Sequence, residues 1–134
     1  MVRRSRASRA DEARDPRAAS ERIRREGIVS GSGRGREDAR WRSTAGFELA
    51  ADASLLIHDA QHGHEEYAAR IGWGHSELRD LLAFATAARV RRVVPFHFDP
   101  GHTDAELDKR FDDARRARLP FDFVPGVEGA TFEL

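Results

Sequence analysis

Two side chains with metal-binding chemistry each follow an apolar run in the second half of the chain. Asp59 follows the run 54–58, and His97 follows the run 93–96. Carboxylate and imidazole groups are common protein ligands of zinc and related divalent metals. At the end of a buried strand such a ligand is held in place while the loop beyond leaves room for substrate, so the pair predicts part of a hydrolytic metal centre. A turn carboxylate at Asp59 and a carbonyl-bonded histidine at His97 remain alternatives.

The segment Gly72-Trp73-Gly74-His75-Ser76 lies at a predicted helix start. Amide donors at a helix N-terminus attract anions such as phosphate, so His75 is a candidate catalytic residue that orients an anionic substrate or protonates its leaving group. The alternative is that Ser76 caps the helix and His75 only precedes it. Trp73 and Ser76 are candidate substrate-binding residues, although Trp73 is equally typical of an aromatic that anchors a loop.

The remaining charged and imidazole residues near these positions give weaker signals. His62 and His64 have the i, i+2 spacing of a metal chelate, but a fuller motif does not follow them. We therefore expect them to lie in a solvated loop together with Glu65 and Glu66. His102 is expected in a surface turn.

Alternating apolar runs and helical periodicity predict the elements that position these residues. Leu78, Leu81, Leu82, Ala85 and Ala88 share one face of a helix. The sequence Thr103-Asp104-Ala105-Glu106 has the spacing of a helix capping box. The predicted elements are strand 54–58, a helix from 75 or 76 to about 88, strand 90–96, helix 103–118, strand 121–124 and a fourth strand over 130–134.

This order, β-α-β-α-β-β, is typical of an α/β layer. Two strands joined by a helix run parallel in a βαβ unit, and their carboxyl ends meet at one edge of the sheet. Asp59 and His97 should therefore emerge side by side.

Composition divides the chain into two parts. Residues 1–46 hold thirteen arginines against seven acidic residues, although the formal net charge of the whole chain is zero. We expect a disordered or weakly helical Arg-rich leader and linker over 1–46, and a folded domain over 47–134. The arginines suggest nucleic-acid binding only weakly, because aromatic residues are not interleaved with them; a nonspecific basic tail is the alternative.

The bulk sequence also restricts location and metal chemistry. There is no cysteine, so any metal must use His, Asp or Glu as ligands. No run approaches the ~18 apolar residues of a membrane span, and the basic N-terminus lacks the apolar core of a secretory signal. A cytoplasmic protein without membrane contact is therefore expected.

Four segments in order, 55–61, 65–67, 72–76 and 93–100, carry a family resemblance. They resemble the C-terminal part of metallo-β-lactamase-fold metallohydrolases, especially ribonuclease-Z-like and phosphodiesterase-like members. The resemblance implies an αββα sandwich, of which residues 47–134 would form the C-terminal half. It also implies a two-metal site, usually zinc, that hydrolyses phosphodiesters or other small molecules. Asp59 matches the bridging aspartate, His97 the last metal-binding histidine, and His75 a histidine that assists catalysis near the phosphate.

One departure from the family pattern limits what the resemblance implies. The first-half signature His-x-His-x-Asp-His is absent, since no histidine precedes His58. We therefore expect a truncated site with weak or partial metal binding. We also expect an exposed sheet face that favours a homodimer or another partner. The alternative function is a non-catalytic remnant or interaction module that retains the half-domain scaffold.

Overall fold

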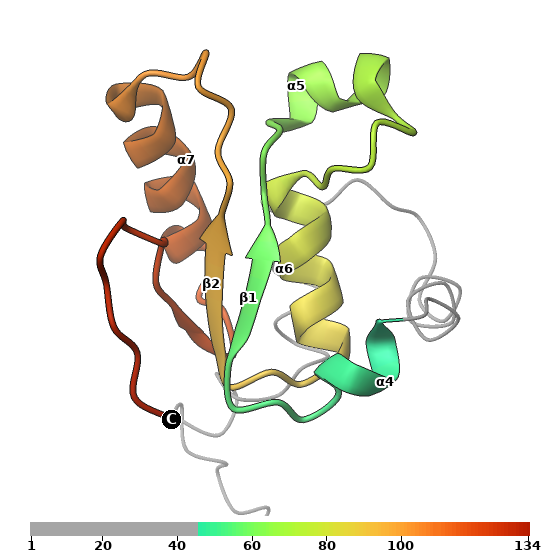
Figure 1. Ribbon diagram of the computed structural model, residues 1–134, viewed down its shortest axis with the longest axis vertical. Helices are drawn as coiled ribbons and strands as arrows, with labels where there is room; N and C mark the ends of the chain where they lie inside the picture. The colour runs from blue at the N-terminus through green and yellow to red at the C-terminus, as the bar shows by residue number, and fades with distance from the viewer. Residues whose placement is uncertain (1–45) are drawn as a thin grey trace, which may run out of the picture.

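Three short parallel strands form the centre of the computed structural model, which describes residues 46–134 (Figure 1). The strands are β1 (Leu56–Asp59), β2 (Arg92–Phe96) and β3 (Asp122–Phe123), and they lie side by side in that order. β1 pairs with β2 over its whole length, whereas β3 pairs with the first two residues of β2. The parallel order confirms the predicted βαβ arrangement.

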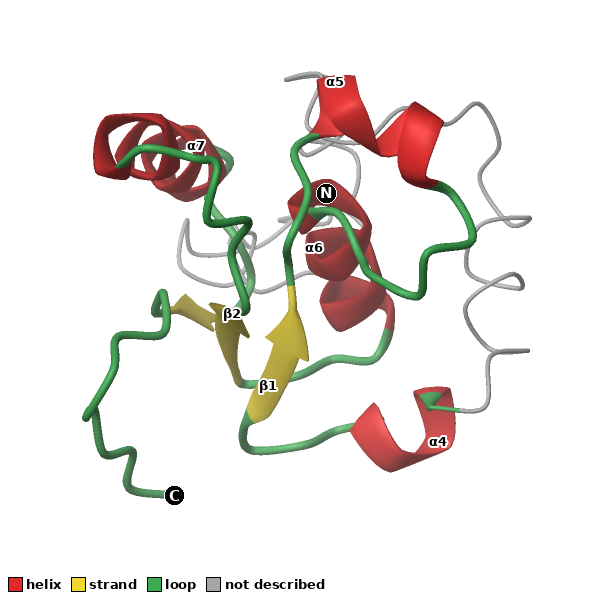
Figure 2. Ribbon diagram, turned by 45° about the horizontal axis from the view of Figure 1, so that its top comes forward, coloured by secondary structure: helices red, strands yellow, loops and turns green. Residues whose placement is uncertain are grey.

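Among the described residues, one short helix precedes the first strand in the chain, and the other helices connect the strands. Helix α6 connects β1 to β2 and helix α7 connects β2 to β3, and both pack on the same face of the sheet (Figure 2). The helical segments are α4 (Phe47–Ala50), α5 (His64–Tyr67), a 3-10 turn (Ala68–Arg70), α6 (Leu78–Ala87) and α7 (Asp104–Arg116).

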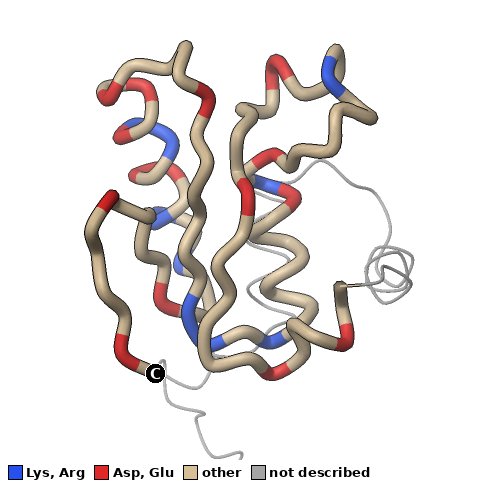
Figure 3. Tube along the Cα trace, in the orientation of Figure 1, with Lys and Arg blue, Asp and Glu red and all other residues tan. Residues whose placement is uncertain are grey.

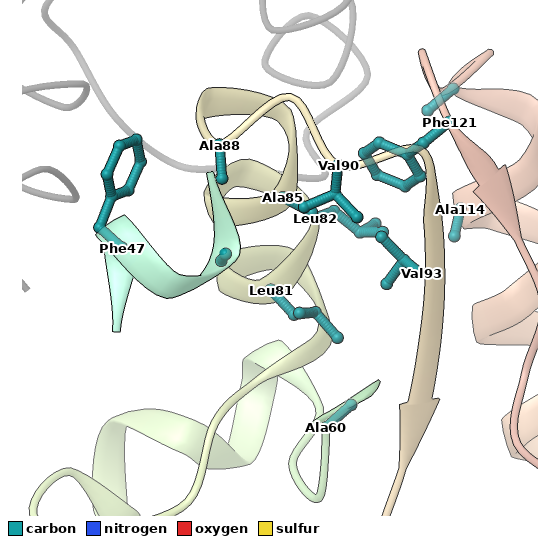
Figure 4. Close-up of a cluster of buried hydrophobic side chains, with 12 residues drawn as sticks. Phe47, Ala60, Leu81, Leu82, Ala85, Ala88, Val90, Val93, Ala114 and Phe121 are labelled. Carbon is teal, nitrogen blue, oxygen red and sulfur yellow. The ribbon is translucent and has the colours of Figure 1, made fainter. Parts of the chain in front are cut away.

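The core lies between the sheet and these two helices (Figure 4). Leu81, Leu82 and Ala85 of α6 are buried against Val93 of β2, and Ala114 of α7 joins the same cluster. These α6 residues belong to the apolar stripe that the sequence predicts. Burial of this stripe is what fixes α6 on the sheet, because a ten-residue helix is marginal in water by itself.

The other face of the sheet is half open. Ile57 is 53% exposed and Phe96 is 45% exposed, whereas Val94 between them is buried beneath the C-terminal segment. At Gly126 this segment runs close to β2, since its N–H donates to the Pro95 carbonyl at 2.8 Å. Residues 46–134 contain one sheet, so the complete αββα sandwich, and association through the open face, remain predictions.

Element boundaries follow the sequence with some shifts. The capping box of α7 is confirmed, because the Thr103 hydroxyl accepts from Glu106 N–H and the Glu106 carboxylate accepts from Thr103 N–H. β1 begins at Leu56 and includes Asp59, whereas we predicted 54–58. Helix α6 begins only at Leu78, because the residues before it pair with the loop that follows β1.

The predicted fourth strand over 130–134 is wrong. Ala130 N–H turns back to the Val127 carbonyl, and the Glu133 carbonyl accepts from the Arg92 side chain, so no ladder forms there. The polar connection 60–74, for which no helix was predicted, contains α5 and the 3-10 turn.

The part of the chain that the structure describes starts at Gly46. The predicted Arg-rich leader therefore falls almost wholly outside it and stays a prediction. No described helix combines the length and apolar character that crossing a bilayer requires.

Candidate metal centre

The carboxyl ends of β1 and β2 bring Asp59 and His97 together. Asp59 is the last residue of β1 and pairs with Phe96, after which His97 leaves the sheet. The Ala60 N–H donates to the Phe96 carbonyl at 2.9 Å, so the two chains remain joined as they leave the strands. His97 Nδ1 lies 2.7 Å from Asp59 Oδ2. The structure thus places this pair side by side, as the strand order predicts.

His75 joins the pair from the segment that precedes α6. Its Nδ1 lies 3.1 Å from Asp59 Oδ2, and its ring centre is 4.9 Å from that of His97. The segment is held by the loop after β1, because His62 N–H donates to the Ser76 carbonyl at 3.1 Å. One ligand atom from each of Asp59, His75 and His97 lies within 4.8 Å of the others.

The Asp59 carboxylate is held by four hydrogen bonds. Burial opposes its ionisation, but the bond from Ser76 N–H, together with bonds from both histidine rings and Gln61 N–H, outweighs burial and holds the Asp59 pKa below its usual value. Oδ1 accepts both backbone bonds, at 2.7 Å from Ser76 and 3.4 Å from Gln61. Oδ2 instead accepts from the two histidine nitrogens, which can themselves bind a cation, whereas the backbone N–H groups on Oδ1 cannot. A bridge through both oxygens would break these bonds.

The backbone around the cluster adopts uncommon conformations. His97 has φ +60°, in the left-handed region that costs a non-glycine residue energy and that is frequent at functional sites. Gly72 and Gly74, on either side of Trp73, also have positive φ, which glycine adopts without penalty. Their turns leave Trp73 68% exposed.

Trp73 is not a buried loop anchor, and Ser76 is not a helix cap, which were the alternatives to substrate binding. Trp73 is too exposed to anchor the loop by burial; its ring lies 5.9 Å from the Arg70 guanidinium carbon. Ser76 is not the helix cap, because the N-cap of α6 is Glu77. Ser76 instead uses its backbone N–H to hold Asp59. Their contact with substrate remains a prediction.

The donor set fits one zinc ion. Two imidazoles and a carboxylate match the three protein ligands of a catalytic zinc; if His75 serves catalysis instead, Asp59 and His97 remain as two ligands, which gives a weaker site. Two ions need about three protein ligands each, which is more than this cluster provides. Acidic residues line the same end of the sheet, in the loops and at the start of α7 (Figure 3), although Glu66 and Asp99 are already paired with Arg70.

A second polar cluster lies beside the candidate metal centre, and its residues are more buried than predicted, although His102 does lie in the turn that follows Asp99. His62, expected in a solvated loop, is 2% exposed. His102, expected in a surface turn, has its side chain 9% exposed and lies 2.8 Å from the Glu66 carboxylate. Glu66, expected in solvent, also accepts from Gly63 N–H, and Arg110 lies 3.7 Å away. Polar contacts among these side chains compensate for their reduced exposure to solvent.

Arg70 belongs to this cluster and was not singled out from the sequence. Its Nη1 contacts Glu66 at 3.3 Å and Asp99 at 2.9 Å. The i, i+4 spacing of Glu66 and Arg70 is a helical ion-pair signal that could have identified the contact. The contact with Asp99 connects the 3-10 turn to the loop after β2, and such a long-range contact cannot be inferred from local residue spacing.

An α/β fold with a possible Asp/His/His metal site is therefore what the described residues define. Two curated proteins named Ribonuclease Z are similar to the chain. That of Brevibacillus brevis is 34% identical over 71 residues, which is 53% of this chain and 22% of the relative. That of Nostoc sp. is 33% identical over 84 residues, which is 58% of this chain and 26% of the relative. No protein-family model matches the chain. The chain thus spans about a quarter of the length of these relatives.

Proposed function

We propose that this chain is the C-terminal part of a metallo-β-lactamase-fold hydrolase that cleaves phosphodiester bonds with the aid of zinc. The observation that carries the proposal is the convergence of Asp59, His75 and His97 at the carboxyl edge of the sheet. The similarity to part of two ribonucleases Z gives independent support and suggests RNA as the phosphodiester.

Asp59 and His97 are the proposed metal ligands. Asp59 Oδ2 and His97 Nδ1 share a hydrogen bond at 2.7 Å, and a bound cation would take the place of that proton. A bound zinc ion lowers the pKa of its water and stabilises charge on the phosphate. Ser76 N–H holds the other Asp59 oxygen and so keeps the carboxylate turned toward the histidines.

His75 is the proposed proton donor to the leaving oxygen. Asp59 accepts from His75 Nδ1, which orients the ring. Within the described residues His75 Nε2 makes no hydrogen bond, so that nitrogen can face the substrate. Trp73 and Ser76 flank it along the chain and are the proposed substrate contacts.

Zinc titration by calorimetry tests the metal site. We expect one zinc ion per chain, bound more weakly than in a complete two-metal centre. Asp59→Asn removes the charge that attracts the cation and should weaken binding about 100-fold, or about 2.7 kcal/mol. Asp108→Asn, which neutralises an exposed aspartate of α7, is the matched control and should bind as the wild type does. Absence of zinc binding by the wild type, or unchanged affinity in Asp59→Asn, would contradict the proposal.

The role of His75 is separable from that of a ligand. With an activated phosphodiester as substrate, His75→Gln should lower hydrolysis while zinc affinity stays within about threefold. A parallel loss of zinc affinity would make His75 a third ligand instead. Any hydrolysis should disappear in Asp59→Asn, and hydrolysis that survives this change would point to another site.

A further inference from the structure

Arg70 connects the two loops that leave the sheet at the candidate metal centre. Its Nη1 lies 3.1 Å from His62 Nδ1 and 2.9 Å from Asp99 Oδ2. His62 comes three residues after Asp59, and Asp99 comes two residues after His97. A single guanidinium nitrogen therefore contacts both loops just beyond the proposed ligands.

Backbone pairing between these loops stops just before the Arg70 contacts. The last backbone bond between them runs from Asp99 N–H to the Gln61 carbonyl at 3.3 Å. From His62 onward, the loop after β1 pairs instead with the segment of Ser76 and Leu78. Arg70 thus extends the connection at the point where the main chain no longer supplies it.

Arg70 also contacts the ring of His62. Arginine can only donate, so in this contact His62 Nδ1 is the acceptor. Nε2 is buried and has no hydrogen-bond partner among the described residues. The ring meets that of His75 edge-on, with centres 6.0 Å apart. The His62 ring therefore packs against that of His75 and contacts Arg70 through Nδ1.

Acidic groups hold Arg70 itself in position. Glu66 Oε2 lies 3.3 Å from Nη1, and the other Glu66 oxygen is 2.8 Å from His102. The Arg70 side chain is 31% exposed, and its guanidinium carbon lies 5.9 Å from the centre of the Trp73 ring. Partial burial and several partners make this arrangement more rigid than a solvated ion pair.

We propose that Arg70 is a positioning residue that holds the His97 loop against the His62–His75 side of the centre. The proposal rests on the proposed function, because its consequence for zinc requires the Asp59–His97 site. Arg70 makes no hydrogen bond or ion pair with Asp59, His75 or His97, so it acts through His62 and Asp99.

Zinc affinity of full-length variants is the first test. Arg70→Met keeps the aliphatic stem and removes all three polar bonds, and it should weaken zinc binding about tenfold, the lower end for a residue that supports ligands. Arg70→Lys supplies one nitrogen with three donors and should restore affinity to within about threefold of wild type. Arg116→Met removes an exposed ion pair of α7, with Asp113 at 2.8 Å, and should have no effect. Wild-type affinity in Arg70→Met, or an equal loss in Arg116→Met, would overturn the proposal.

A zinc-free measurement separates this proposal from the metal site itself. Nuclear Overhauser contacts between the His75 and His97 rings, 4.9 Å apart, should weaken in Arg70→Met and persist in the Lys and Arg116 variants. Wild-type protein that binds no zinc would refute the proposed function, yet this contact would still decide the role of Arg70. An unchanged contact in Arg70→Met would overturn it. If Arg70→Met does not fold, Asp99→Ala removes the same loop connection and should weaken the same contact.

Discussion

The helix-covered face of the sheet consists of buried apolar side chains, whereas its carboxyl edge carries partly exposed polar ones. On the covered face, Leu82 and Val93 are fully buried among other apolar side chains. At the edge, Asp59, His75 and His97 remain partly exposed and bond to one another. Apolar burial is insensitive to direction, whereas the edge depends on the aim of each nitrogen and oxygen. The first region supplies stability and the second supplies donors that a ligand can use.

Four non-glycine residues of the described chain have positive φ, and His97 is the one that lies at the edge, whereas Asp52, Arg89 and Arg118 lie elsewhere. His97 adopts a left-handed conformation immediately after β2, where Val93, Val94 and Pro95 are all buried. The well-packed strand can hold His97 in this unfavourable backbone conformation, which directs its imidazole at Asp59. Perturbing the two regions separately should therefore affect different properties.

Leu82→Ala tests the stability side of the comparison and should have the largest effect. Leu82 is fully buried between α6 and the sheet, so the lost contacts and the cavity should cost about 2–5 kcal/mol. Urea unfolding followed by circular dichroism measures this loss. Ile57→Ala on the open face is the control and should cost under about 1 kcal/mol, because that side chain is already half in water. Equal losses would mean that the open face is covered in solution.

The sequence predicted the covered face well because its signals are local. The 3.6-residue spacing of Leu78, Leu81 and Leu82 defines α6, and the Thr103–Glu106 pair defines the start of α7. The predicted fourth strand is wrong because the composition of a short terminal segment does not show whether another strand lies beside it to pair with. At 130–134 the neighbouring contact comes from the Arg92 side chain, not from a strand.

The edge was predictable only in part. The βαβ order places Asp59 beside His97, and this follows from topology. Burial of His62 and His102 does not, because each is buried by charged partners that lie far away in the chain or in other elements. Residue by residue, histidine and glutamate favour solvent; together with Arg70 and Arg110 they form a cluster that tolerates burial.

Glu66→Gln tests whether this cluster contributes to stability through charge. Burial opposes Glu66 ionisation, but Gly63 N–H, His102, Arg110 and Arg70 outweigh it and hold the Glu66 pKa below its usual value. A lowered carboxyl pKa gives stability that is full above the unfolded value of about 4.3 and is lost as pH falls through the folded value. The variant should lose about 1.5 kcal/mol at pH 7. That difference from wild type should vanish in acid.

Unfolding curves at pH 7 and at successively lower pH measure this effect. Glu65→Gln is the matched control, because Glu65 is the exposed neighbour in the same helix, and its stability should follow wild type at every pH. A pH-independent loss in Glu66→Gln would show that shape, not charge, matters at this position.

Glycine and alanine at position 97 should give the smallest effect and the sharpest view of the edge. Both remove the imidazole, but at φ +60° glycine avoids the steric penalty that alanine keeps. His97→Gly should therefore be about 1 kcal/mol more stable than His97→Ala in zinc-free unfolding. At Phe96, the last residue of β2, the order should reverse, because a strand residue with ordinary backbone angles favours alanine. The same order at both positions would show that the left-handed backbone at His97 is not kept in solution.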